Sequence, residues 1–175
     1  MKIITLKEMI ILALLIAMEI VLSRFLSISM PTIKISFAFL PIAFAAILFG
    51  PIWAGIAGAL ADFLGAILFP VGAFFPGFTL TALLVGVVYG LFLYKGHSSL
   101  TKDILRITIA AFIVTFILQL GLDTLWVSMI TGTDYVALIA TRVIRSAVML
   151  PIQVVLISLI KASKQLFPGD FEKPS

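Results

Sequence analysis

The stretch ILRITIAAFIVTFILQLGLDTLWVSMI, residues 104–130, is a long apolar run in which Arg106 and Asp123 are the charged residues. A transmembrane helix needs about 20 predominantly apolar residues, so this run is long enough to cross a bilayer. The whole chain has the same character, because 62% of its 175 residues are hydrophobic, 11% are charged and the mean hydropathy is +1.27. A soluble chain of this size could not bury so much apolar surface, so most of it must lie in lipid.

Further apolar segments flank this run, and they predict an all-α membrane protein with six transmembrane helices in a single domain, residues 1–175. The other segments cover about residues 6–25, 37–49, 52–69, 79–94 and 136–160. With six spans both termini lie on one side, and eight of the twelve Lys and Arg residues fall on that side: Lys2, Lys7, Lys95, Lys102, Arg106, Lys161, Lys164 and Lys173. Because Lys and Arg gather in cytoplasmic loops, we expect both termini to be cytoplasmic.

Several classes of function are excluded by what the sequence lacks. The chain has no cysteine and one histidine, His97, which excludes a catalytic thiol and a metal site built from several histidines. It has no G-x-x-x-x-G-K-[ST] motif, so we expect no nucleotide hydrolysis by this chain itself. We therefore expect a protein that is not an enzyme and that holds neither a cofactor nor a metal.

Charged side chains within the apolar segments are the first candidates for function. Glu19, Asp62, Asp123, Arg142 and Arg145 all fall at membrane depth. Each would cost at least about 2.5 kcal/mol at the bilayer centre if it faced lipid, so each should face the protein interior or an aqueous cavity. Two interpretations stay open, a site for a polar ligand and structural ion pairs, and for Glu19 the ion pair is preferred.

Polar residues also recur at helical spacing near the outer end of the fifth segment. Gln119, Asp123 and Trp126 follow at i, i+4 and i+7, which places them on one face of an α-helix. On the sixth segment Arg142 and Arg145 are one turn apart. These two stripes favour a pocket wall, although an interfacial tryptophan anchor with inward polar groups has the same spacing.

The segment between the third and fourth spans, FPVGAFFPGF at 69–78, combines prolines, glycines and aromatic residues. Irregular backbone at membrane level persists only where it is buried or lines a cavity. We expect an ordered loop on the extracellular side, and its composition favours a ligand lid over a simple interfacial turn. Its candidate ligand contacts are Gly72, Phe74, Phe75, Gly77 and Phe78.

Small residues four apart occur on three of the segments and allow close helix approach. The pairs are Ala13 with Ala17, Ala54 with Gly58, and Gly86 with Gly90. The spacing does not say which pair packs inside the bundle and which meets a partner chain.

Three stretches together resemble a known family. GPIWAG at 50–55, ADFLG at 61–65 and FPVGAFFPGFTL at 69–80 are similar to the substrate-binding (S) component of energy-coupling factor (ECF) vitamin transporters, most of all to its folate-specific members. Ala13 and Ala17 resemble the A-x-x-x-A motif on the first helix of that superfamily. The resemblance covers nearly the whole chain.

The resemblance implies a membrane-embedded binding subunit that takes up folate from outside a bacterial cell. It further implies docking, through Ala13 and Ala17, on an ECF module made of a transmembrane coupling subunit and two ATPase subunits. Folate is then the transported ligand rather than a cofactor. The alternatives are an S component for thiamin, riboflavin or pantothenate, a self-contained secondary transporter, and a membrane enzyme.

A folate ligand suggests roles for the candidate residues. The donor-rich edge of a flat pterin suits a carboxylate, which is either Asp62 or Asp123, and its faces suit aromatic stacking. The stacking candidates are Phe74, Phe75 and Trp126, and the cationic candidates are Arg24, Lys34, Arg142 and Arg145. The other residues expected at the site are Gly72, Gly77, Phe78, Thr79, Gln119 and Tyr135.

Overall fold

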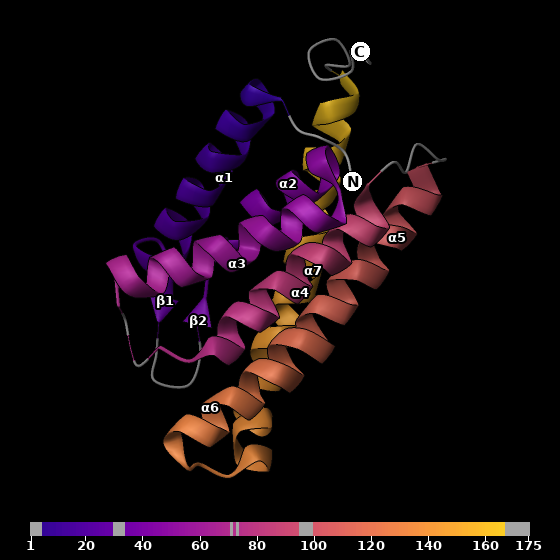
Figure 1. The fold of residues 1–175 in the computed structure, drawn as a ribbon. Helices are drawn as coiled ribbons and strands as arrows, with labels where there is room; N and C mark the ends of the chain where they lie inside the picture. Colours follow the sequence, from indigo (N-terminus) through magenta and orange to yellow (C-terminus); the bar gives the residue numbers. More distant parts are fainter. Residues whose placement is uncertain (1–4, 30–33, 71, 73, 95–99, 167–175) are drawn as a thin grey trace.

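The computed structural model describes residues 5–29, 34–70, 72, 74–94 and 100–166, and helices dominate it (Figure 1). Along the chain these are α1 Leu6–Arg24, α2 Phe39–Phe49, α3 Pro51–Leu68, α4 Pro76–Leu93, α5 Leu100–Phe112, η1 Ile113–Leu122, α6 Asp123–Thr131 and α7 Tyr135–Leu166. The π-helical segment η1 joins α5 and α6 without a break, so the described residues form six helical rods. The predicted all-α architecture with six helices is therefore confirmed.

A two-residue hairpin joins α1 to α2. Strand β1, Ile28–Ser29, pairs antiparallel with strand β2, Lys34–Ile35. The apolar runs did not indicate this hairpin, because strands of two residues carry no periodic pattern.

Not every rod is long and apolar enough to cross a membrane. Among the described residues, α3, α4, the α5–η1–α6 rod and α7 meet both conditions. Helix α2 is a shorter apolar helix of 11 residues, which spans about 16 Å at 1.5 Å per residue. Helix α1 has 19 residues but carries Lys7, Glu8, Glu19 and Arg24 along its length.

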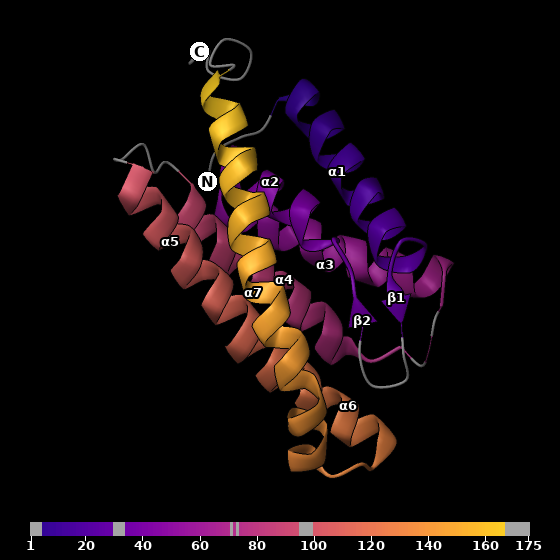
Figure 2. The same cartoon turned by 180° about the vertical axis from the view of Figure 1, so that it is seen from behind.

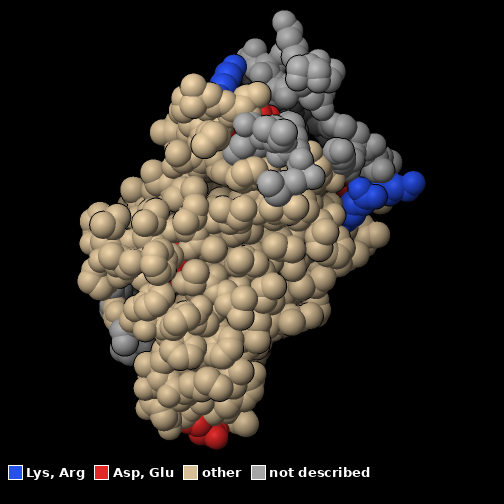
Figure 3. Space-filling view, in the orientation of Figure 1, with Lys and Arg blue, Asp and Glu red and all other residues tan. Residues whose placement is uncertain are grey.

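The placement of charge agrees with the predicted orientation. The start of α1, the start of α5 and the end of α7 lie at the same end of the molecule, opposite α6 and the hairpin (Figures 1 and 2). Lys and Arg atoms gather at the first end, an acidic group lies at the other, and the face between them is almost free of charged side chains (Figure 3). This distribution is the one expected when the end with the termini faces the cytoplasm.

Helices α3 and α4 pack most extensively of all the pairs, and glycines make this possible. A Cβ atom added at Gly86 would collide with the Ala54 carbonyl, and one at Gly90 would collide with the backbone of Pro51. A Cβ at Gly58 would meet the Ala82 carbonyl. The small-residue pairs of α3 and α4 are therefore used inside the bundle, where backbone meets backbone.

This packing predicts the effect of one methyl group. We expect Gly86→Ala to destabilise the protein by about 1–3 kcal/mol, because the Ala54 carbonyl is backbone and cannot move aside. The matched control is Gly121→Ala, since a Cβ there would lie 3.7 Å from the nearest atom, the Phe116 carbonyl oxygen. Thermal unfolding in detergent measures both variants, and equal melting temperatures would contradict the close contact of α3 and α4.

A turn at Gly50-Pro51 separates α2 from α3. Gly50 ends α2 with φ +84°, in the region that favours glycine, and Pro51 occupies the first position of α3, where its missing N–H costs nothing. The expectation of an irregular segment through residue 78 is wrong at its end, because Pro76 starts α4 in the same way and Gly77 and Phe78 are helical. Val71, Ala73 and His97 lie outside the described residues.

Polar groups buried between helices add specific links to the bundle. Tyr89 of α4 and Thr115 of η1 each donate a hydrogen bond to Gln153 Oε1 of α7, both at 3.0 Å. All three side chains are nearly inaccessible to solvent. This contact ties three rods together in the core.

Lys161, which we expected on the cytoplasmic surface, is buried in the structure. Its Nζ atom lies 2.9 Å from Oδ1 of Asp103 in α5. Because Lys161 is on the inner side of α7, this carboxylate compensates its buried charge. The expectation that Lys161 is a loop cation is wrong.

Candidate ligand-binding site

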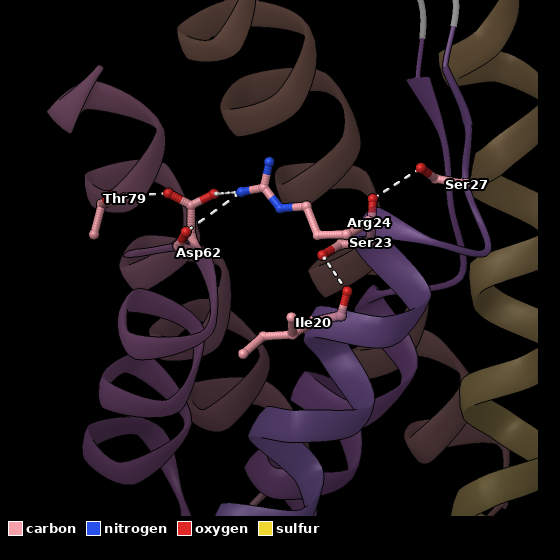
Figure 4. Close-up of polar contacts among 6 residues, drawn as sticks. All are labelled: Ile20, Ser23, Arg24, Ser27, Asp62 and Thr79. Carbon is pink, nitrogen blue, oxygen red and sulfur yellow. Dashed lines mark hydrogen bonds and ion pairs between the residues drawn. The ribbon is translucent and has the colours of Figure 1, made fainter. Parts of the chain in front are cut away.

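The first of two polar groups near the end opposite the termini joins α1, α3 and α4 (Figure 4). Arg24 Nη2 lies 3.6 Å from Asp62 Oδ1 and donates to the Asp62 backbone carbonyl at 3.4 Å. Thr79 donates a hydrogen bond to Asp62 Oδ2 at 2.8 Å. Both oxygens of the Asp62 carboxylate therefore have partners within the protein.

The end of α1 is built to hold this arginine against α3. Ser23 and Ser27 donate to the carbonyls of Ile20 and Ser23, at 3.2 and 2.8 Å, and so close the last turn (Figure 4). A Cβ at Gly65 would lie 2.9 Å from Arg24 Nε, so glycine leaves room for the guanidinium. This packing fixes the guanidinium beside Asp62.

The second group, which we call the Thr81 cluster, consists of Phe75, Thr81, Asp123 and Trp126. The Trp126 indole Nε1 donates to Thr81 Oγ1 at 3.0 Å, and the ring centroids of Trp126 and Phe75 are 5.5 Å apart. The Asp123 carboxyl lies near the same Thr81 hydroxyl and interacts with it electrostatically. The N-terminal parts of α4 and α6 are thereby joined by an aromatic wall with a carboxyl beside it.

Gly77 allows this wall to form. A Cβ atom there would lie 2.6 Å from both Phe75 Cε1 and Trp126 Cδ2, so any other residue would push the two rings away. Phe78 extends the wall, with its ring centroid 6.3 Å from that of Phe75 in an edge-to-face arrangement. The glycine at the start of α4 therefore makes room for the aromatic side chains that form the wall.

Asp123 differs from Asp62 in having unmatched hydrogen-bonding capacity. Its Oδ1 atom is buried and has no hydrogen-bond partner in the described structure, and the same is true of Arg145 Nε. Asp123 interacts electrostatically with Arg145 and Arg142 of α7 and with Asp62. An acceptor and a donor that are both buried and unmatched are costly in a native protein, which makes Asp123 and Arg145 candidates for bonding to a ligand.

The predicted stripe on the fifth rod is only partly realised. Asp123 and Trp126 both belong to α6 and both reach Thr81. Gln119 lies in the π-helical segment η1, whose i→i+5 hydrogen bonds widen each turn. A turn widened in this way holds slightly more than four residues, so Gln119 and Asp123 still lie close to one face, and the role of Gln119 in the pocket wall stays a prediction.

The other predicted residues are spread around this region. Arg142 is buried and its Nη1 donates to Thr124 Oγ1 at 3.3 Å, and the Tyr135 hydroxyl donates to the Gly121 carbonyl at 3.4 Å. Phe74 packs on Phe63 of α3, with ring centroids 5.8 Å apart. The structure therefore does not bring Phe74 to Trp126.

Some candidates are less constrained by the structure. Gly72 is exposed, and a Cβ added there would have no atom within 4 Å. Lys34 lies in β2, but its side chain is outside the described part of the structure. Ala13 and Ala17 are both exposed on α1, so this pair is not used for packing within the chain.

Thr81 and Thr124 are the polar contacts that sequence analysis missed. A threonine in an apolar helix commonly bonds its own backbone, and Thr81 does donate to the Gly77 carbonyl at 3.1 Å. No pattern in the sequence marks which threonine also meets a side chain from another helix. A group of three or more His, Cys, Asp or Glu residues that could bind a metal is absent from the described residues.

Comparisons with known proteins give a consistent result. The family model for the substrate-specific component of ECF transporters matches residues 7–161. The folate transporter FolT of Clostridium novyi is 43% identical over 149 residues, which cover 85% of this chain and 84% of that protein. The folate transporter FolT of Leuconostoc mesenteroides is 34% identical over 153 residues, which cover 85% and 80%.

Solved structures show the same fold. A crystal structure of FolT bound with folic acid superimposes with a TM-score of 0.85 at 36% identity, covering 98% of this chain and 100% of that one. The S component of a bacterial ECF transporter matches with a TM-score of 0.54 at 22% identity, covering 93% of each chain, and shows the fold alone. The chain belongs to the ECF transporter family as a substrate-specific component.

Proposed function

We propose that this chain is the folate-binding subunit of an ECF transporter and a multi-pass protein of the bacterial cell membrane. The observation that carries the proposal is its likeness, over nearly its whole length, to the FolT structure determined with folic acid. The Thr81 cluster supports it, because an aromatic wall beside a carboxyl matches the flat face and donor-rich edge of a pterin.

Asp123 is the carboxylate that we assign to the pterin edge. Asp62 already has an arginine and a threonine on its two oxygens, whereas Asp123 Oδ1 is buried and unmatched. A pterin edge carries both N–H donors and a carbonyl acceptor, and Arg145 Nε is an unmatched donor near the same carboxylate. The pair of Asp123 and Arg145 can therefore satisfy such an edge with one acceptor and one donor.

The pterin faces are assigned to the aromatic wall of Phe75, Phe78 and Trp126. For the carboxylates of the folate tail, Lys34 and Arg142 are the cations that we propose. Arg24 is assigned instead to holding Asp62, because its guanidinium contacts both the side chain and the backbone of that residue.

We further propose that transport depends on partner chains. The chain carries no P-loop sequence, so ATP hydrolysis takes place on ATPase subunits that act through a transmembrane coupling subunit. This chain binds and releases folate, without a cofactor and without catalysis of its own. Ala13 and Ala17, which are exposed on α1, are the proposed docking contact.

Titration of the purified chain with folate tests the proposal. We expect nanomolar affinity, about −12 kcal/mol, and quenching of tryptophan fluorescence, because Trp126 lies in the proposed wall. Thiamin, riboflavin, pantothenate and biotin are titrated in parallel and should leave the fluorescence unchanged. Tight binding of one of these vitamins, with no signal from folate, would replace the proposed substrate.

A further inference from the structure

Thr81 occupies a position that connects the separate parts of the proposed pterin site. It lies on α4, one turn after Gly77, and only 3% of its surface is exposed. Its hydroxyl accepts the hydrogen bond from Trp126 and neighbours the carboxyl of Asp123. One oxygen atom thus contacts both the aromatic face and the acidic edge of the site.

The single hydrogen of this hydroxyl has two neighbouring acceptors. A threonine hydroxyl has one hydrogen and two lone pairs, and an indole N–H can only donate. Trp126 Nε1 therefore fixes one lone pair of Thr81, and the single hydrogen points to the Gly77 carbonyl or to Asp123. Removing the oxygen leaves the indole without its acceptor and takes one polar neighbour away from Asp123.

We propose that Thr81 is the positioning residue of the folate site, holding the Trp126 ring and the Asp123 carboxyl at the separation that a pterin requires. This inference rests on the proposed function. Thr81 acts on the ligand through these two residues, and we assign it no direct contact with folate. The structure gives the reason, because the indole N–H of Trp126 bonds to Thr81 while the indole ring packs against Phe75.

Thr81→Val and Thr81→Ser separate this role from packing. Valine has nearly the shape of threonine but no hydroxyl, whereas serine keeps the hydroxyl and loses a methyl group. We expect Thr81→Val to weaken folate binding roughly 10- to 100-fold, the range that follows from leaving one polar group unmatched. Thr81→Ser is expected to bind within about 3-fold of the unchanged chain, a difference of under 1 kcal/mol.

A spectroscopic measurement reports on Trp126 directly. The chain has two tryptophans, so Trp53→Phe leaves Trp126 as the single emitter. In this background we expect the emission maximum to move to shorter wavelength in Thr81→Val, because the indole N–H loses its acceptor, and to return in Thr81→Ser. If Thr81 served only in packing, restoring the hydroxyl in Thr81→Ser would not restore the emission maximum.

Thr108→Val is the matched control. Thr108 donates to the Ile104 carbonyl at 2.9 Å, the same bond to the preceding turn that Thr81 makes, but it lies on α5. Its replacement should change neither folate affinity nor the emission of Trp126. Size-exclusion profiles confirm that each variant is folded before the titrations are compared.

The outcomes distinguish this inference from the proposed function. Calorimetry on the unchanged chain comes first, and failure to bind folate there overturns both. If the unchanged chain binds folate and Thr81→Val binds equally well, the positioning role is wrong and the proposed function stands. Equal losses in Thr81→Val and Thr81→Ser would also overturn it, because the effect would then follow packing rather than the hydroxyl.

Discussion

Ala13→Trp combined with Ala17→Trp is expected to abolish folate uptake while leaving folate binding by the isolated chain unchanged. Both alanines are exposed on α1, so bulky side chains there meet nothing within the chain. Helix association in lipid depends on close packing, and two indole rings on this face would keep a partner helix away. Uptake of labelled folate by cells and co-purification with the coupling subunit measure the loss, and fluorescence titration of the same preparation measures binding.

The control is an equal increase in bulk elsewhere on the surface. Ala140→Trp with Ala147→Trp places two indole rings on exposed positions of α7 and should leave uptake intact. Normal uptake by the Ala13 and Ala17 variant would remove the proposed docking contact. Simultaneous loss of binding and uptake would show that this face supports the fold itself.

Asp123→Asn is expected to weaken folate binding at least 100-fold, corresponding to about 3 kcal/mol or more. The substitution keeps the shape but removes the negative charge, so the ligand edge loses a charge-assisted acceptor. The guanidinium groups of Arg142 and Arg145 lose a compensating charge at the same time. Calorimetry with folate measures the change, and the melting temperature without ligand shows how much of it comes from the fold.

Asp62→Asn is the informative comparison, because it makes the same chemical change in the paired carboxylate. Asp62 is held by Arg24 and Thr79, so its neutralisation should lower the melting temperature and affect affinity less than Asp123→Asn. If Asp62→Asn weakened folate binding more than Asp123→Asn, the two roles would be exchanged and Asp62 would be assigned to the pterin edge.

Much of the fold follows from local sequence. Each helix coincides with an apolar run, because a backbone in lipid must satisfy its hydrogen bonds within the segment, and this makes hydropathy a direct signal. The Gly50-Pro51 turn is equally local, since glycine allows the positive φ and proline suits the first helical position. The π-helical segment η1, in contrast, was not indicated by the apolar run, which is equally compatible with an ordinary α-helix.

The choice between similar candidates needed the tertiary structure. Membrane depth alone predicted that Asp62 and Asp123 face inward, because a lipid-exposed carboxylate is costly, but it could not say which of them has a partner. That depends on the approach of Arg24 from α1 and Thr79 from α4, which are distant in sequence. The small-residue pairs were equally ambiguous until Gly86 proved to be packed against Ala54 and Ala13 to be exposed.

Sequence thus determined which segments are apolar helices and which charges must avoid lipid, because these depend on the transfer of each segment from water to lipid. Tertiary structure alone decided that Thr81 joins Trp126 to Asp123 and that Asp123 keeps an unmatched oxygen. A hydrogen bond between helices depends on atomic positions set by the packing of both helices. No periodicity within either helix contains that information.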